Sequence, residues 1–340
     1  MPDLPANQLA SALARFPRYP LLEGPTPIQL LSRLSEQLGV AVYVKRDDLM
    51  GVGGGGNKLR KLEYLLGAAL AGGADTIITV GGRQSNHARL TAAAAAHAGL
   101  ACELVLTRSA ARQDATYVDN GNVLLDELFG STIHDLPAGA DAQASAEARA
   151  TELRGQGRNV FVAPLGGSSP LGCLGYAACA YEIAAQEQAM QLHFGRIVLA
   201  NGSGGTQAGL AAGFTLLEGS AQRVEAYTVL APLAQAQATT EQKAAQTLAL
   251  LQEQSTASAP QIRVRGDQLG EGYGVPTPAM LAAVRLLAQT EGLLLDPVYS
   301  GKAFAGLLDD ARTGQLRPGE PVLFLMTGGL PGLFAYRTAF

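Results

Sequence analysis

Tryptophan is absent from this 340-residue sequence, cysteine occurs only three times, and no block of like charges stands out. Cys102, Cys173 and Cys179 include no CxxC pair, and an odd number of cysteines provides neither a disulfide framework nor a zinc site. We therefore expect three buried thiols and no metal centre. The formal net charge is −4 without a basic cluster, which disfavours nucleic acid as a partner and a polybasic membrane anchor.

Long hydrophobic runs are also missing. The first residues lack the apolar core of a secretory signal. The most apolar run, residues 90–106, is rich in alanine and is interrupted by His97 and Glu103. It therefore fits a buried helix followed by a strand better than a membrane span. We expect a cytoplasmic protein without membrane association.

Glycine and short apolar runs are abundant. The 41 glycines and 47% apolar residues are typical of α/β enzymes with many tight turns. The apolar runs resemble parallel strands buried on both faces, and the leucines of 58–71 recur at helical spacing. The alternation predicts an α/β fold with open, mostly parallel sheets flanked by helices, which bind ligands at the carboxyl ends of strands. The predicted strands are 41–45, 76–80, 102–106, 160–164, 196–200, 224–230 and 321–326.

A lysine directly behind a glycine run is the first candidate site. The stretch GVGGGGNKLRKLEYLL, residues 51–66, nearly matches a nucleotide-binding P-loop. It departs from that pattern because Asn57 places Lys58 one position late, and because Leu59 stands where a Ser or Thr would bind magnesium. With Asn57 as N-cap, Lys58 lies in the first helical turn, where the dipole contributes only about 0.3–1 kcal/mol. That is less than one pKa unit, so a neutral amine needs burial or capture as an imine. An ordinary solvated lysine is the alternative.

A strand that runs into Gly202, Ser203, Gly204, Gly205 and Thr206 is the second candidate. Backbone N–H groups and two hydroxyls can converge there on an anion at the start of a helix. The dinucleotide pattern GxGxxG is not met, because glutamine follows Thr206. The pattern favours a monophosphate without metal, and a plain strand-to-helix turn is the alternative.

The third candidate, GGRQSNHARL at residues 81–90, also follows a strand directly. Ser85 is either a plain N-cap or part of a polar cluster with Asn86 and His87. His87 is either a general base or a packed side chain beside an alanine-rich helix. A reactive lysine, a monophosphate loop and no metal cluster together point to pyridoxal 5′-phosphate, which has an aldehyde, a phosphate and an electron-withdrawing ring.

Over nearly its whole length, from about Phe16 to Tyr336, the chain resembles the fold-type II pyridoxal-phosphate enzymes. It is similar to the branch of the 1-aminocyclopropane-1-carboxylate (ACC) deaminases and D-cysteine desulfhydrases. The resemblance implies a tryptophan synthase β-subunit-like fold, with a large cofactor-binding domain of residues 1–59 plus 171–340 and a small mobile domain of residues 60–170. The motifs that carry it are YVKRDD, GGNKLRKLE, QSNHAR, GGSSPLGCLGY, GSGGTQAGL, GYGVPTP, LDPVYSGKAFAGL and TGGLPGLFAY.

The resemblance also implies which residues hold the cofactor. Lys58 carries it as a Schiff base and returns as a base once substrate displaces it. Asn86 bonds the ring hydroxyl, and the loop 202–206 binds the phosphate. The implied cofactor-binding residues are Lys58, Asn86, Gly202, Ser203, Gly204, Gly205, Thr206, Ser300 and Thr327.

Other matched positions imply contacts with the substrate. Ser85 lies over the face opposite the lysine, where it holds the substrate carboxylate or moves a proton, with Asn86 and His87 beside it. Tyr273 and Tyr299 approach the substrate. The implied catalytic residues are Lys58, Ser85, Tyr273 and Tyr299.

Position 300 separates the branches of the family. ACC deaminases carry an acidic residue after the tyrosine of DPVY, whereas desulfhydrases carry a small hydroxyl residue, and here it is Ser300. A neutral partner weakens the ring as an electron sink, which suits loss of an α-proton and departure of a good leaving group. The resemblance thus implies α,β-elimination from D-cysteine to pyruvate, hydrogen sulfide and ammonia, possible also with β-chloro-D-alanine. ACC deamination to 2-oxobutyrate and ammonia is one alternative, and an L-cysteate sulfo-lyase is the other.

Arg83 departs from the family pattern, in which an aliphatic residue is expected before QSN. It is either an exposed charge on the turn or a guanidinium that attracts an anionic substrate, as in the related L-cysteate sulfo-lyases. Relatives form dimers, so a homodimer is expected by analogy. The sequence does not fix the handedness of the substrate.

Overall fold

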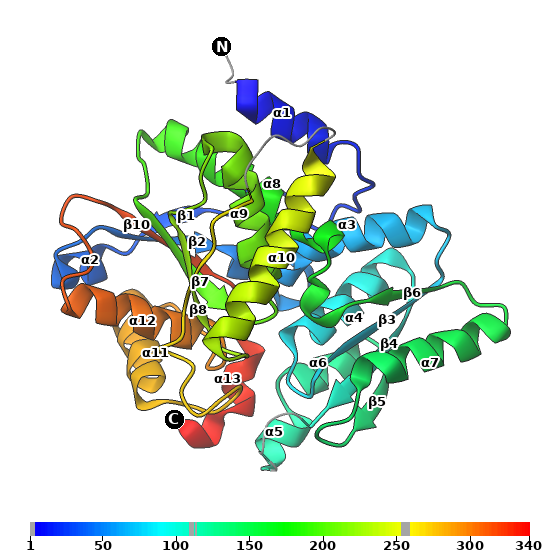
Figure 1. The fold of residues 1–340 in the computed structure, drawn as a ribbon. Coiled ribbons are helices and arrows are strands. Elements are labelled where there is room, and N and C mark those ends of the chain that lie inside the picture. The colour runs from blue at the N-terminus through cyan, green and yellow to red at the C-terminus, as the bar shows by residue number, and fades with distance from the viewer. Residues whose placement is uncertain (1–3, 109–111, 113, 253–258) are drawn as a thin grey trace.

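The computed structural model describes residues 4–108, 112, 114–252 and 259–340. Its strands form two sheets, flanked by helices (Figure 1). The six-stranded sheet has the order β1-β2-β10-β7-β8-β9, and the four-stranded sheet has the order β5-β4-β3-β6. All pairings are parallel except that of β1 with β2. The predicted α/β class with open, mostly parallel sheets is confirmed.

The seven predicted strands are present, and three further strands were not predicted. The unpredicted strands β1, β5 and β9 are short and lie at sheet edges, where one side of the strand is unpaired and an unbroken apolar run is not required. The strands are β1 Ile28–Leu30, β2 Val42–Arg46, β3 Thr76–Gly82, β4 Ala101–Thr107, β5 Thr132–Leu136, β6 Val160–Ala163, β7 Arg196–Asn201, β8 Val224–Thr228, β9 Arg263–Arg265 and β10 Val322–Met326.

The helix predicted over 58–71 is α3, and its leucines are buried. The α-helices are α1 Leu4–Leu13, α2 Ser32–Leu38, α3 Lys58–Ala71, α4 Asn86–Ala98, α5 Ala115–Asp119, α6 Asn122–Leu128, α7 Ala142–Gly155, α8 Pro170–Met190, α9 Gly205–Glu218, α10 Leu233–Leu251, α11 Pro278–Glu291, α12 Ser300–Arg312 and α13 Pro331–Ala335. The 3₁₀ helices are η1 Asp47–Leu49, η2 Val52–Gly54, η3 Leu165–Gly167 and η4 Arg337–Ala339. None of the helices in the described ranges is long and apolar enough to cross a bilayer.

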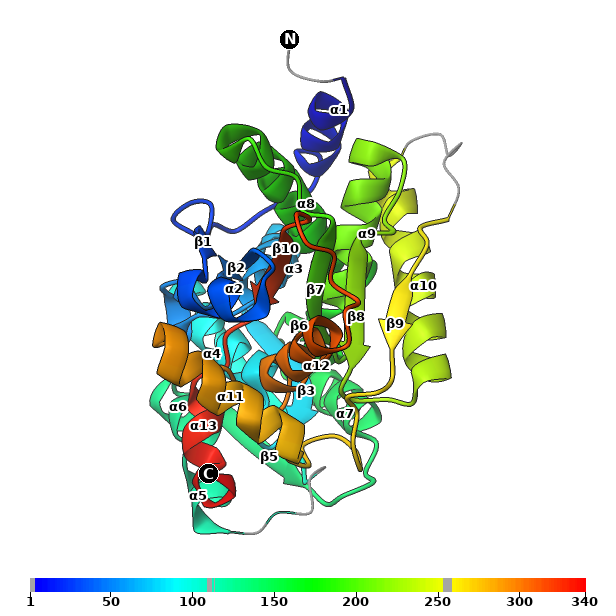
Figure 2. The ribbon, with the colours of Figure 1, turned by 90° about the vertical axis from the view of Figure 1, so that its left-hand side faces the viewer.

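Each sheet is covered on both faces. In the large sheet, α8 and α9 pack on one face and α2, α11 and α12 pack on the other, and Figure 2 shows α12 and α9 on opposite sides of it. In the small sheet, α3 and α4 cover one face and α7 covers the other. Burial on both faces explains why the central strands are mostly apolar.

The large sheet takes strands from both ends of the chain, whereas the small sheet takes its strands from residues 76–163. The helices α3 and α8 connect the two sheets and touch closely, since a Cβ at Gly175 would lie 2.0 Å from the Arg60 carbonyl oxygen. The division into residues 1–59 plus 171–340 and residues 60–170, and the mobility of the smaller part, stay predictions.

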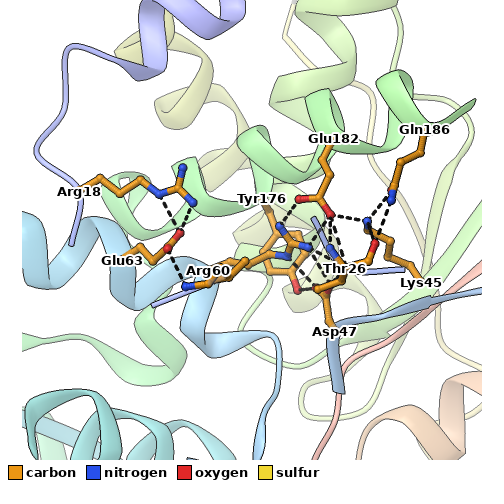
Figure 3. Close-up of polar contacts among 10 residues, drawn as sticks. Arg18, Thr26, Lys45, Asp47, Arg60, Glu63, Tyr176, Glu182 and Gln186 are labelled. Atoms are coloured by element: carbon orange, nitrogen blue, oxygen red, sulfur yellow. Dashed lines mark hydrogen bonds and ion pairs between the residues drawn. The ribbon is translucent and has the colours of Figure 1, made fainter. Parts of the chain in front are cut away.

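A buried network of charges joins β2, α3 and α8 (Figure 3). The Arg60 guanidinium donates to Asp47 Oδ1 at 2.9 Å and to Glu182 Oε2 at 2.8 Å. Lys45 donates to Glu182 and, at 2.7 Å, to the Thr26 carbonyl oxygen. Burial raises the pKa of Asp47, but Arg60 and Lys45 lower it by more, so the carboxyl is held ionised. Lys45 and Asp47 of YVKRDD and Arg60 of GGNKLRKLE therefore join these elements through buried contacts.

Candidate active site

Two adjoining cavities lie where the carboxyl ends of strands from both sheets meet. The smaller is lined by Asn57, Lys58, Asn86, the loop 202–206 and Thr327. The larger has a volume of about 280 Å³. Of the predicted site residues, Lys58, Ser85, His87, Ser203, Tyr273 and Tyr299 line it. The placement agrees with the rule that open α/β sheets bind ligands at this edge.

Lys58 is the first residue of α3 and lines both cavities. Burial lowers the pKa of its amine to about 8, which the helix dipole alone could not do. Asn57 does not act as the predicted N-cap: its side chain makes no capping bond, and its amide donates to Thr206 Oγ1 at 3.0 Å. The tertiary contact with α9 replaces the cap and ties the start of α3 to the loop 202–206.

Lys61 was not predicted, although it lies one helical turn after Lys58. Its amine is fully buried and donates to Ser168 Oγ at 2.9 Å and to the Gly166 carbonyl oxygen at 3.2 Å. Burial, followed by the neighbouring charge of Lys58, lowers its pKa well below the usual range. Ser168 Oγ in turn lies 2.7 Å from Ser203 Oγ. The signal in the sequence is a second lysine at i+3, which shares the face of Lys58.

The loop 202–206 comprises the turn after β7 and the first two residues of α9. Gly204 has a φ of 83° at the helix N-cap, a conformation that favours glycine. No side chain caps the helix, and its first N–H groups have no acceptor within the helix. A Cβ at Gly205 would lie 2.4 Å from Ser168 Oγ. The described residues that line the cavity include no carboxylate, so the loop suits a phosphate.

A further lysine, Lys243 of α10, lies beneath this loop. Its amine donates to the Ser203 carbonyl oxygen at 2.6 Å, and burial lowers its pKa. It adds positive potential beside the loop. This contact was not predicted, because Lys243 is 40 residues from Ser203 along the chain.

The helix α4 begins beyond the carboxyl end of β3, with Ser85 as its N-cap and Asn86 and His87 as its first two residues. Ser85 is an N-cap, with Oγ accepting from the Ala88 N–H at 3.1 Å, and it also lines the larger cavity. Asn86 lines the smaller cavity. His87 Nε2 lies 2.8 Å from Thr79 Oγ1, and burial lowers the pKa of the imidazole well below its usual value. The imidazole is therefore neutral near pH 7, as a packed, hydrogen-bonded side chain would be.

Tyr273 and Tyr299 meet at the larger cavity, with their hydroxyl oxygens 2.7 Å apart. Burial raises the pKa of both phenols, so they remain protonated donors near neutral pH.

Ser300 is a predicted site residue that lines neither cavity. It is buried, and its Oγ donates to Asp296 Oδ1 at 2.6 Å. Asp296 also accepts the backbone N–H groups of Val298, Tyr299 and Ser300, and so organises the start of α12. The role of Ser300 beside a cofactor ring stays a prediction.

Arg83 lines neither cavity. Its guanidinium donates to Asp135 Oδ2 at 2.9 Å and to the Val118 carbonyl oxygen at 3.0 Å. The prediction of an exposed charge is wrong, because the side chain is only 19% exposed in this ion pair. The alternative, contact with an anionic substrate, is not supported by the geometry either.

The expectation of three buried thiols is confirmed. Within the described ranges, no group of three or more His, Cys, Asp or Glu side chains is arranged to hold a metal ion.

Comparison with known proteins identifies the family. The model of the pyridoxal-phosphate dependent enzymes matches residues 19–328. The chain belongs to this family. As a pyridoxal-phosphate enzyme, it is 46% identical to a D-cysteine desulfhydrase of Serratia proteamaculans over 330 residues, covering 96% of this chain and 98% of that protein. It is equally 46% identical to a D-cysteine desulfhydrase of Salmonella schwarzengrund, covering 95% and 97% of the two chains.

Solved structures agree with this assignment. The crystal structure of an ACC deaminase homologue is 40% identical, with a TM-score of 0.87 and 98% of both chains covered. A threonine deaminase is 20% identical with a TM-score of 0.64, covering 96% of this chain and 98% of that one, and this likeness shows the shared fold alone. The resemblance to fold-type II enzymes is therefore confirmed.

The residues of this pyridoxal-phosphate enzyme fit its cofactor. An amine with a lowered pKa faces the same cavity as a loop of free N–H groups. An aldehyde needs the first group, and a phosphate dianion needs the second. Lys58 and the loop 202–206 are therefore the residues suited to hold pyridoxal 5′-phosphate.

Proposed function

We propose that this enzyme is a carbon–sulfur lyase that converts D-cysteine and water into pyruvate, hydrogen sulfide and ammonia. β-Chloro-D-alanine, with chloride as the leaving group, is a second proposed substrate. The observation that carries the proposal is the 46% identity to a D-cysteine desulfhydrase over 96% of the chain. The hydroxyl residue Ser300 after the DPVY motif supports it.

The cofactor, when bound, supplies an aldehyde for the substrate amine and a ring that withdraws electrons from the α-carbon. Lys58 is the proposed base that removes the α-proton, because its lowered pKa leaves much of the amine neutral near pH 8. The loop 202–206 is the proposed phosphate site. Asn86 and Thr327, which line the same cavity, are proposed to orient the ring.

The substrate is proposed to bind in the larger cavity. The N-terminus of α4 offers unpaired N–H groups and a partial positive charge for the substrate carboxylate, with the hydroxyl of Ser85 beside them. The paired phenols of Tyr273 and Tyr299 are proposed to donate a proton toward the departing sulfur.

The chemistry of the larger cavity favours an uncharged β-substituent. Among the described residues that line the two cavities, Lys58 is the only cationic side chain, because His87 is neutral. A sulfonate therefore finds no second cation, and L-cysteate is the weaker candidate substrate. ACC deamination to 2-oxobutyrate is the second candidate function, favoured by the 40% identity to an ACC deaminase homologue.

One purified sample decides among these reactions. D-cysteine, L-cysteine, L-cysteate and ACC are each supplied to the protein loaded with pyridoxal phosphate. The proposal expects pyruvate and sulfide from D-cysteine at a kcat/KM at least tenfold above that for the other three. Formation of 2-oxobutyrate from ACC as the main activity would replace the proposal by the second candidate.

The assignment of Lys58 has a separate test. Reduction of the loaded protein with borohydride is expected to fix the cofactor on the peptide that contains Lys58. Labelling of Lys61 or Lys243 instead would contradict the proposed site, whatever the substrate is.

We further propose that the enzyme is a homodimer in the cytoplasm, by analogy with the family. Sedimentation analysis of the loaded protein tests the first part, and a monomer would contradict it.

A further inference from the structure

The segment between β9 and α11 carries Tyr273 but has little structure of its own. Two backbone bonds occur within residues 266–275, Leu269 N–H to Gly266 O at 3.3 Å and Val275 N–H to Gly272 O at 3.4 Å. Gly270, Gly272 and Gly274 have φ values of 65°, 150° and 72°, which favour glycine and fit no regular helix or strand. The position of Tyr273 must therefore be fixed by other parts of the fold.

Lys302 of α12 supplies such a contact. Its amine donates to the Leu269 carbonyl oxygen at 2.7 Å and to the Gly272 carbonyl oxygen at 2.9 Å. The residue is fully buried, and no carboxylate within the described ranges forms an ion pair with it. A buried ammonium without a counter-ion is costly, so two carbonyl dipoles from one loop are its compensation.

The same loop is fixed on the other side of Tyr273. The Tyr336 hydroxyl donates to the Gly274 carbonyl oxygen at 2.9 Å. Tyr299, whose hydroxyl meets that of Tyr273, lies three residues before Lys302 at the start of α12. One helix start therefore provides both the phenol that pairs with Tyr273 and the ammonium that holds its loop.

We propose that Lys302 is a positioning residue of this enzyme: its buried ammonium holds residues 269–272 so that Tyr273 meets Tyr299 and faces the substrate cavity. The proposal rests on the proposed function for its kinetic consequence alone. The tether itself is a property of the folded protein, whichever substrate is turned over.

A double-mutant cycle tests the kinetic part. Lys302→Met and Tyr273→Phe are each expected to lower kcat with D-cysteine 10- to 100-fold. The double variant is expected to be no slower than the slower single variant, because Lys302 acts through Tyr273. Multiplicative effects, or an unchanged kcat in either single variant, would overturn the proposal.

Lys45→Met is the matched control. Lys45 is also fully buried and donates to a backbone carbonyl, but it lies in the charge network behind α3. The Lys45→Met substitution is expected to lower thermal stability while kcat stays within about twofold of wild type.

A second variant, Lys302→Gln, serves if Lys302→Met fails to fold. Its side chain retains two hydrogen-bond donors without the charge, so most of the wild-type kcat is expected. A kcat lower in Lys302→Gln than in Tyr273→Phe would contradict the tether, because Lys302 would then act other than through Tyr273.

Hydrogen exchange of the protein loaded with pyridoxal phosphate tests, without any substrate, whether Lys302 holds the loop in place. Amides of residues 270–274 are expected to exchange at least tenfold faster in Lys302→Met, or in Lys302→Gln to a smaller extent, and at the wild-type rate in Lys45→Met. Equal rates in all proteins would overturn the proposal. Faster exchange of these amides in Lys302→Met, together with a wild-type protein that does not turn over D-cysteine, would reject the proposed function and leave the tether intact.

Discussion

Lys58 illustrates how burial decides the chemistry of a single residue. Its place in the first turn of α3 opposes the helix dipole by only about 0.3–1 kcal/mol. Burial has the larger effect and lowers the pKa of the amine to about 8. Position along the helix marks the residue as unusual, and its surroundings make it reactive.

A pH dependence of cofactor capture follows at the residue scale. The neutral amine attacks the aldehyde, and the neutral fraction rises as the pH passes the pKa. We expect the rate at which the apoprotein captures pyridoxal phosphate to rise with pH along a titration curve whose midpoint lies near pH 8. The absorbance of the bound form measures this rate. A midpoint near the ordinary lysine value of about 10.4 would contradict a buried amine, and Lys58→Ala should show no capture.

Arg83 is the second residue with a testable assignment. Its guanidinium is occupied by Asp135 and the Val118 carbonyl oxygen. We therefore expect Arg83→Leu to leave KM for D-cysteine and for L-cysteate within about twofold of wild type. Removal of a partly exposed ion pair should lower the free energy of unfolding by only about 0–1 kcal/mol. A KM for cysteate that rises while that for cysteine does not would assign the arginine to substrate binding.

At the scale of elements, the backbone conformation at the start of α9 determines whether the loop 202–206 can bind an anion. The helix begins without a side-chain cap, which leaves its N–H groups for an anion. The neighbouring side chains of Ser168 and Lys61 approach so closely that a Cβ at Gly205 would lie 2.4 Å from one and 3.0 Å from the other. Glycine at this position keeps the loop open.

We expect Gly205→Ala to weaken binding of pyridoxal phosphate at least tenfold, since the added methyl group displaces side chains that support the loop. Titration of the apoprotein, followed by absorbance, measures the affinity. Gly155→Ala is the control, because no atom lies within 4 Å of its Cβ position. It should leave the affinity unchanged and stabilise the end of α7 by at most about 1 kcal/mol. Equal affinities in both variants would show that the loop tolerates a side chain there.

At the scale of the whole molecule, the network around Arg60 joins η1 and the helices α3 and α8, which run between the two sheets. It links Asp47 of η1, directly after β2, with Glu182 on α8 through one guanidinium (Figure 3). Removal of one partner from a buried network leaves an uncompensated charge, which costs about 3–5 kcal/mol. The network therefore supports the fold without touching either cavity.

We expect Arg60→Met to lower the free energy of unfolding by about 3–5 kcal/mol at pH 7, measured by urea denaturation. The pKa of Asp47 is held below its usual value, so the stabilisation is present above the unfolded pKa of about 3.9 and is lost as the pH falls below it. The difference between variant and wild type should therefore shrink under acid conditions.

Arg149→Met is the matched control for this prediction. The Arg149 side chain is 30% exposed in its ion pair with Glu103, so its loss should lower the free energy of unfolding by much less than the loss of Arg60 does. A similar cost for the two variants would mean that burial of the Arg60 network adds nothing to stability.

The sequence by itself determined the α/β class, the central strands and the three stretches that meet at the site. These features are local, because strand apolarity, helical spacing and glycine-rich turns can be read within about ten residues of chain. The edge strands β1, β5 and β9 were missed, since a strand paired on one side needs no apolar run.

Only the tertiary structure decided the role of Asn57, the orientation of Arg83 and the part played by Lys61, Lys243 and Lys302. Each of these side chains finds its partner far away in the chain. Asn57 and Thr206 are 149 residues apart, and Lys302 and Leu269 are 33 apart. A hydrogen bond depends on separation in space, and packing of α3, α9 and α12 around the two cavities sets that separation.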